Sequence, residues 1–112
     1  MQHIDTNTLA THCRDELLRR NAVFEAFFKR EARRLAEACR RMSERFLSGG
    51  RLLAFGSGPA ATDAQHVSVE FVHPVIVGKR ALPALDLGPE FEGRLSTILH
   101  DQDMVMGFSF PE

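Results

Sequence analysis

The residues that could do chemistry in this sequence lie close together, in the stretch LLAFGSGPAATDAQHVSVEF at 52–71. A short apolar run enters the turn Gly56-Ser57-Gly58-Pro59, and a polar, alanine-rich segment follows. A glycine-rich turn that leads from a strand into a helix offers backbone N–H groups and the positive end of the helix dipole to an anion. Ser57 can add a hydroxyl. Read alone, this turn is a weak signal, because many strand-to-helix turns contain two glycines.

His66 and Glu70 are the titratable pair of this stretch. Their i, i+4 spacing places them on one face of a helix. Taken alone, such a pair is more often an ordinary surface pair than part of a site, and both interpretations stay open at this point. The two cysteines, Cys13 and Cys39, have no CxxC or CxxH spacing, so they do not indicate a structural zinc site. Both lie in helical patterns, where we expect buried, reduced thiols.

The elements that must position these residues alternate along the chain. Residues 6–48 contain no proline or glycine and predict helix, with Thr6 or Asn7 as the N-cap. Because a single helix of that length is unusual without strict heptads, we expect two helices with a break near 29–31, the second ended by Gly49-Gly50. The remaining pattern predicts strands at 51–55, 82–87 and 103–110 and helices at 60–72 and 90–99. This alternation indicates an α/β fold with a parallel sheet covered by helices.

The first helical segment carries a phenylalanine-rich face that includes Val23, Phe24, Phe27 and Phe28. Two interpretations are open for this face. It is either part of the core within the chain or an interface between subunits, since exposed aromatic patches usually have a partner.

Composition limits the classes of function. At 112 residues the chain is one domain by size, and its net charge of −1 creates no general attraction to nucleic acid or membranes. No apolar run is long enough to span a membrane, and Asp5 and Arg14 interrupt any early signal sequence, so we expect a reducing cytoplasm. The basic run at 29–45 is best explained as a solvated helix face, with a surface for an acidic partner as the alternative.

The longer string GGRLLAFGSGPAATDAQHVSVEF resembles the start of the sugar isomerase (SIS) domain. It is most similar to the phosphoheptose isomerase branch, which also contains the DnaA initiator-associating proteins, and KRALPAL at 79–85 fits as well. The resemblance implies a three-layer sandwich with a parallel sheet, in which residues 1–48 are helices used in oligomerisation and 49–112 begin the SIS domain. The matching positions are Gly56, Gly58, Ala61, Asp63, Ala64, Gln65, His66, Glu70 and Phe71.

The resemblance also implies a function. Phosphoheptose isomerases interconvert sedoheptulose 7-phosphate and a heptose phosphate, and they are tetramers held partly by their N-terminal helices. Carried over to this chain, the family implies a zinc site at His66 and Glu70 and a proton-transferring role for Glu70. A carboxylate beside a metal can move a proton between neighbouring sugar carbons. The substrate-binding positions it implies are Ser57, Gly58, Pro59 and Ser109.

The sequence departs from the family pattern at several of these positions. Pro59 stands where the family has a glycine, Ala60 where it has a phosphate-binding serine, and Phe-Pro-Glu follows Ser109 in place of hydroxyls and glycine. An Asn-Asp pair after the second strand has no counterpart. The later strands, with the Gln and His that complete the metal site, are also missing, so we expect either a piece of a longer protein or a short form completed by another chain.

Two functions therefore remain open at the level of sequence. One is an aldose–ketose isomerase that acts on a sugar phosphate, and the other is a non-catalytic SIS scaffold that oligomerises and binds a protein partner or an altered ligand. A weaker third idea is that the basic run contacts nucleic acid, which would require strong dependence of binding on salt.

Overall fold

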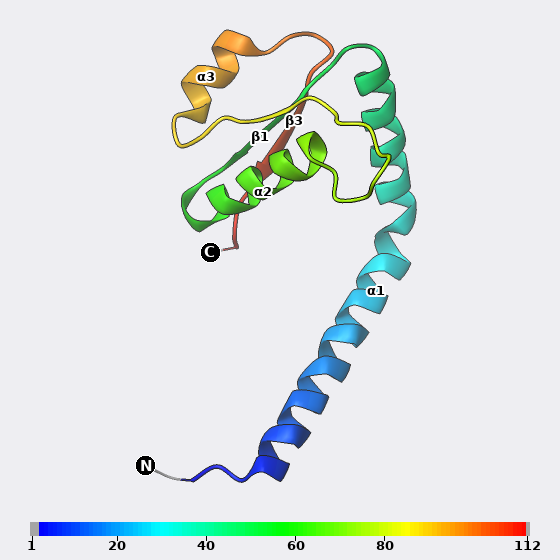
Figure 1. Ribbon diagram of the computed structural model, residues 1–112, viewed down its shortest axis with the longest axis vertical. Coiled ribbons are helices and arrows are strands. Elements are labelled where there is room, and N and C mark those ends of the chain that lie inside the picture. The colour runs from blue at the N-terminus through cyan, green and yellow to red at the C-terminus, as the bar shows by residue number, and fades with distance from the viewer. Residues whose placement is uncertain (1–2, 112) are drawn as a thin grey trace. The chain divides into compact units, whose positions relative to one another are not determined.

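The computed structural model describes residues 3–111 and contains one parallel sheet with helices (Figure 1). The chain divides into two compact units, and the boundary along the sequence lies between Cys39 and Arg40. The expected alternation of helices and strands is confirmed. Glu112, which follows the third strand in the sequence, lies outside the described residues. The elements in order are α1 (Thr6–Leu47), β1 (Leu52–Gly56), a 3₁₀ turn (Gly58–Ala60), α2 (Ala61–Val72), β2 (Ala84–Asp86), α3 (Phe91–Ile98) and β3 (Met104–Phe108). Among the described residues, no helix is both long and apolar enough to cross a membrane.

The N-terminal segment is one continuous helix, so the expected break near 29–31 is wrong. The helix has no residue that would interrupt its backbone, because proline and glycine are absent from it. Ion pairs also cross the position of the expected break. The Glu31 carboxylate accepts from Arg30 at 3.0 Å and from Arg34 at 3.1 Å, which favours continuous helix there.

Both ends of α1 are capped by local sequence. The N-cap is Asp5 rather than Thr6 or Asn7, since a carboxylate oxygen of Asp5 accepts the backbone N–H of Thr8 at 3.3 Å. At the other end Gly50 N–H donates to the Arg45 carbonyl at 2.9 Å, and Gly49 N–H donates to the Phe46 carbonyl at 3.1 Å. This is the Schellman pattern, and Gly49 has the positive φ of 87° that it requires. The expectation that the two glycines end the helix is confirmed.

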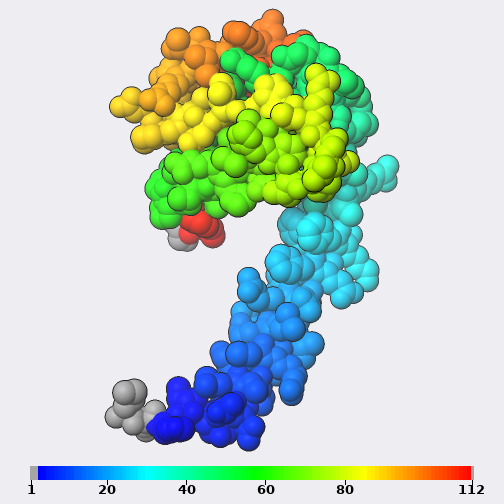
Figure 2. All heavy atoms as spheres, in the orientation of Figure 1, coloured from blue at the N-terminus to red at the C-terminus, as the bar shows by residue number. Residues whose placement is uncertain are grey.

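None of the residues of α1 is buried. In the space-filling view the side chains of its N-terminal part, in blue, stand out around the helix (Figure 2). The phenylalanine-rich face is exposed, at 56% for Phe24 and 53% for Phe28, and the unit that carries it has no core of its own to bury it. Cys13 and Cys39 are exposed as well, and the expectation of buried thiols is wrong. Both cysteines lie in α1, as the helical pattern predicts, but on sides of the helix that stay exposed.

The sheet has the strand order β2-β1-β3, with both pairs parallel. Because β1 is the central strand, its side chains are covered on both faces, and Leu52, Leu53 and Ala54 are all buried. The connection through α2 leads from β1 to one edge, and the connection through α3 crosses to the other edge. Right-handed crossovers therefore place α2 and α3 on opposite faces of the sheet.

One charged pair joins the amino-terminal ends of β1 and β3. The side chain of Asp103 is only 2% exposed, and it accepts from Arg51 Nη2 at 2.7 Å, from Arg51 Nε at 3.2 Å and from two backbone N–H groups, those of Arg51 and His100, at 2.9 Å each. Arg51 Nη2 also donates to the Ile98 carbonyl at 2.7 Å. The Arg51 guanidinium holds the pKa of Asp103 well below its usual range, and the backbone donors act in the same direction. This arrangement fastens the end of α3 and the start of β3 to the start of β1.

A glycine in β3 makes room for an aromatic ring on β1. A Cβ at position 107 would lie 2.8 Å from Cζ of Phe55, whose ring stacks on Phe91 of α3 with centroids 4.4 Å apart. We expect Gly107→Ala to lower the free energy of unfolding by about 1–3 kcal/mol, because the stacked ring has to move. Chemical denaturation measures this. The matched control is Gly93→Ala in α3, where a Cβ meets nothing within 4 Å, so that alanine should stabilise the helix slightly. Equal loss of stability in the two variants would contradict the prediction.

Candidate functional site

The turn after β1 is folded as one turn of 3₁₀ helix that leads directly into α2. Ser57 is extended, and Gly58 has a φ of 55°, which a glycine accepts without strain. The Ala60 N–H donates to the Ser57 carbonyl at 3.2 Å, and the Ala61 N–H donates to the Gly58 carbonyl. Ser57, Gly58 and Pro59 are exposed, whereas Ala60 is fully buried.

Ser109 lies at the same edge of the sheet as this turn. Gly56 of β1 is paired with Phe108 of β3, so Ser57 and Ser109 each follow directly after paired positions in adjacent parallel strands. We call this edge, formed by the residues that follow β1, β2 and β3, the carboxyl edge. In open α/β sheets ligands bind at this edge. The structure therefore brings together all four of the positions predicted to bind substrate: Ser57, Gly58, Pro59 and Ser109.

Helix α2 has two faces of different chemistry. Small residues spaced by four, Ala60 just before the helix and Ala64 and Ser68 within it, are buried. The Ser68 hydroxyl is satisfied by the Ala64 carbonyl at 2.9 Å, so this face can approach the sheet closely. His66 and Glu70 each follow a buried position by two residues, which turns them about 200° away from the sheet. The same spacing that packs the helix therefore presents this pair outward.

His66 and Glu70 are in contact on that outward face. Nε2 of His66 lies 3.3 Å from Oε1 of Glu70, and the two side chains are 75% and 44% exposed. The pair is not at the carboxyl edge, because α2 rises about 1.5 Å per residue and Glu70 is nine residues beyond its first residue, Ala61. Within this chain the candidate proton-transferring carboxylate and the candidate substrate loop are thus about 14 Å apart along the helix.

The pair is a partial fit to the zinc site that the resemblance implies. Two tetrahedral ligands at about 2.05 Å from zinc lie about 3.3 Å apart, which agrees with the Nε2–Oε1 distance of 3.3 Å. A catalytic zinc needs three protein ligands. Among residues 3–111, no group of three histidine, cysteine, aspartate or glutamate side chains could hold a metal. His66 and Glu70 could therefore supply two ligands, and the others would have to come from outside the described residues.

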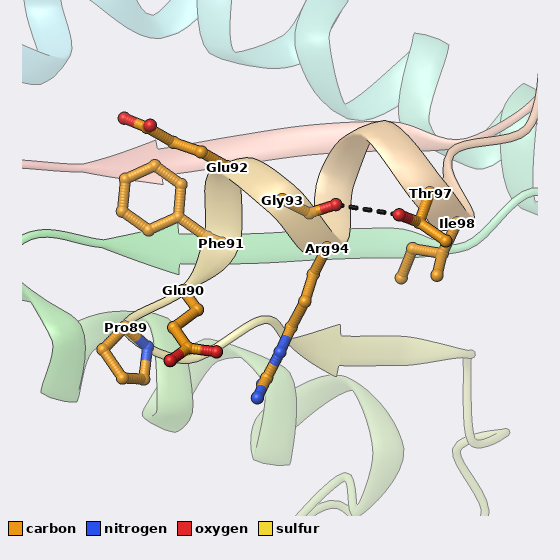
Figure 3. Close-up of a pocket in the computed structure, with 8 residues that line it drawn as sticks. All are labelled: Pro89, Glu90, Phe91, Glu92, Gly93, Arg94, Thr97 and Ile98. Atoms are coloured by element: carbon orange, nitrogen blue, oxygen red, sulfur yellow. Dashed lines mark hydrogen bonds between the residues drawn. The ribbon is translucent and has the colours of Figure 1, made fainter.

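The pocket in Figure 3 was not anticipated from the sequence. It lies against α3 and is lined by Pro89, Glu90, Phe91, Glu92, Gly93, Arg94, Thr97 and Ile98, none of which was a predicted site residue. Arg94 points toward the loop that follows β2, where its Nη1 donates to the Leu87 carbonyl at 2.8 Å. This contact braces the second loop of the carboxyl edge. A hydrogen bond from a helical arginine to a backbone carbonyl seven residues earlier leaves no recognisable mark in the sequence.

Comparison with known proteins supports the resemblance noted in the sequence. Residues 19–107 match the SIS domain family. The chain is 37% identical to the phosphoheptose isomerase of Desulfovibrio desulfuricans over 101 residues, which is 90% of this chain and 46% of that protein. It is 35% identical to the phosphoheptose isomerase of Pelobacter propionicus over 67% of this chain and 40% of the relative, and 33% identical to that of Thermodesulfovibrio yellowstonii over 72% and 40%. The chain spans less than half the length of each of these relatives.

Proposed function

The chain belongs to the SIS domain family, and from that premise we propose that it forms the first part of a sugar-phosphate-binding protein related to phosphoheptose isomerases. In the whole protein its three strands would belong to the three-layer SIS sandwich. The observation that carries the proposal is the contact of His66 with Glu70 on the outward face of α2. An exposed carboxylate beside an imidazole, held on a rigid helix, is a suitable group for proton transfer to a ligand that a further segment or chain encloses.

In this proposal Glu70 moves a proton between the two neighbouring carbons of an aldose–ketose pair, and His66 orients its carboxylate. When bound, zinc would supply polarisation of the sugar carbonyl. His66 and Glu70 would hold it together with ligands from outside residues 3–111. The two side chains already lie side by side, so both can reach one metal ion without any movement of the helix backbone. The hydroxyls of Ser57 and Ser109 lie at the carboxyl edge, about 14 Å along α2 from Glu70, so they would contact a part of the sugar other than the reacting carbons.

We expect Glu70→Gln in the full-length protein to slow isomerisation of sedoheptulose 7-phosphate at least about a hundredfold, because general acid–base catalysis contributes that much or more. His66→Ala should abolish stoichiometric zinc, as measured by elemental analysis. The matched control is His73→Ala, since His73 is also exposed but follows the end of α2. Unchanged rates and zinc content in both site variants would exclude the assigned roles.

Assembly through α1 is the second part of the proposal. Leu17, Phe24, Phe28 and Leu35 are spaced by seven, four and seven residues, so they lie along one side of the helix. We call them the apolar stripe; their exposed fractions are 58%, 56%, 53% and 40%. A row of large apolar side chains that stay about half exposed favours pairing with further copies. We propose a homotetramer held in part by this stripe.

A second candidate function is a non-catalytic scaffold that binds a protein partner or an altered ligand. It is favoured by the same apolar stripe, together with the fact that only two metal ligands are brought together among residues 3–111. Calorimetry with sedoheptulose 7-phosphate separates the two candidates. An intact oligomer that binds neither zinc nor the sugar phosphate would support the scaffold and exclude the isomerase.

A further inference from the structure

The carboxyl edge has the position of an anion site, but its first turn has few donors left for an anion. Two of the N–H groups that follow β1, those of Ala60 and Ala61, donate to carbonyls within the turn itself. Pro59, which lies between Gly58 and Ala60, has no N–H. The Thr62 hydroxyl donates to the Pro59 carbonyl at 3.0 Å. An anion at this turn would therefore have to compete with bonds that the turn has already made.

The side chain at position 60 is also unavailable to a ligand. Ala60 is fully buried, and its carbonyl lies so close to the strand end that a Cβ at Gly56 would be 2.3 Å from it. The turn is therefore pressed onto the end of β1, and position 60 faces the interior. A hydroxyl there would point into the core rather than toward the carboxyl edge.

The charge at this edge is unfavourable to phosphate. The strands and their following loops, residues 52–65, 84–90 and 104–111, contain no lysine, arginine or histidine. They do contain Asp63 in the first turn of α2, Asp86 and Glu90. The Asp63 carboxylate itself provides the negative charge that the helix N-terminus favours. Arg94, a cation of α3, uses one of its nitrogens on the Leu87 carbonyl in the loop after β2.

We propose that Pro59 is a specificity-determining residue that excludes phosphate from the turn after β1. This rests on the proposed sugar-phosphate binding and adds to it that the donors for the phosphate come from outside this turn. At the first position of a helical turn an N–H points outward without a partner. Any residue but proline would therefore restore an outward donor next to the exposed Ser57 and Gly58.

The test is a titration of the full-length protein with inorganic phosphate, followed through the backbone amide NMR signals of Ser57, Gly58 and Ala60 against sodium chloride of equal ionic strength. The wild type should show no saturable shift. Pro59→Gly and Pro59→Ala should each show saturable shifts, with phosphate bound at least about tenfold more tightly than the detection limit of the wild-type titration, as expected for one added charge-assisted hydrogen bond. Alanine adopts the same backbone conformation as Pro59, so the Pro59→Ala titration can be interpreted even if the glycine variant unfolds.

The matched control is Pro89→Ala, which changes an exposed proline in the loop after β2 and should leave these three signals unaffected. Saturable shifts in the wild type, or variants at position 59 that behave like the wild type, would overturn the assignment. Because the probe is phosphate alone, this result can be read whether or not the protein binds a sugar phosphate, and calorimetry with sedoheptulose 7-phosphate tests that separately.

Discussion

Asp103→Ala should lower the free energy of unfolding by about 3 kcal/mol. The variant leaves the Arg51 guanidinium without its carboxylate, and it leaves the backbone N–H groups of Arg51 and His100 without their acceptor. The value is at the low end for a broken buried pair, because Asp103 is 2% exposed but Arg51 keeps 27% of its side chain in solvent. Denaturant titration measures the change.

The pH dependence of the stability provides a second test of the Arg51–Asp103 pair. Because the pKa of Asp103 is lowered in the folded chain, its contribution is fully present above the unfolded value of about 3.9 and is lost as the pH falls below it. Thermal melts between neutral and acid pH should therefore show a steeper loss in the wild type than in Asp103→Asn. Glu16→Ala is the control, since it removes an exposed pair with Arg19 and should leave the midpoint unchanged. Equal acid sensitivity of wild type and Asp103→Asn would contradict the prediction.

If α1 holds copies together as proposed, replacing Phe24 and Phe28 by serine should dissociate that assembly. Both rings are about half exposed in the single chain, so burying the rest of each one contributes roughly 1 kcal/mol. In an interface between two copies each substitution is present twice, so the two substitutions together weaken association by about 4 kcal/mol. This is nearly three orders of magnitude in the association constant. Light scattering after size-exclusion chromatography would then find monomers at concentrations where the wild type is assembled.

The chain provides a closely matched control for that experiment. Leu17 belongs to the apolar stripe and Leu18 does not, yet the two are neighbours with exposed fractions of 58% and 60%. Their side chains point about 100° apart around the helix. Leu17→Ser should weaken the assembly and Leu18→Ser should not. Equal effects would show that general hydrophobicity rather than this side of α1 holds the copies together.

Much of the fold could be predicted from the sequence, since apolar runs, turns and helix formers are local signals. The break at 29–31 was wrong because it came from a general rule on helix length, whereas Glu31 has two arginines within reach. The cysteines were placed in the interior because helical periodicity indicates which side of a helix is apolar. It does not tell whether that side is covered by the same chain.

The candidate site was predictable where it depends on local spacing and not where it depends on long-range contacts. The spacing of His66 and Glu70 predicts that they share one face of α2, and on that face Nε2 of His66 lies 3.3 Å from Oε1 of Glu70. The bond from Arg94 to Leu87 and the pairing of Arg51 with Asp103 were missed. The second pair joins residues that are 52 positions apart, which no local pattern can indicate.

The strand order β2-β1-β3 also affects how the chain folds during synthesis. The central strand, β1, is made first, and the pairing of Leu52 with Met104 requires that the 52 later residues have been synthesised. At about 5–20 residues per second, β1 waits roughly 3–10 s for this second neighbour. Helix α1 needs only local contacts and forms within microseconds. On each ribosome a finished helix with an apolar stripe therefore precedes an unfinished sheet, so the proposed pairing through α1 does not have to wait for the sheet to form.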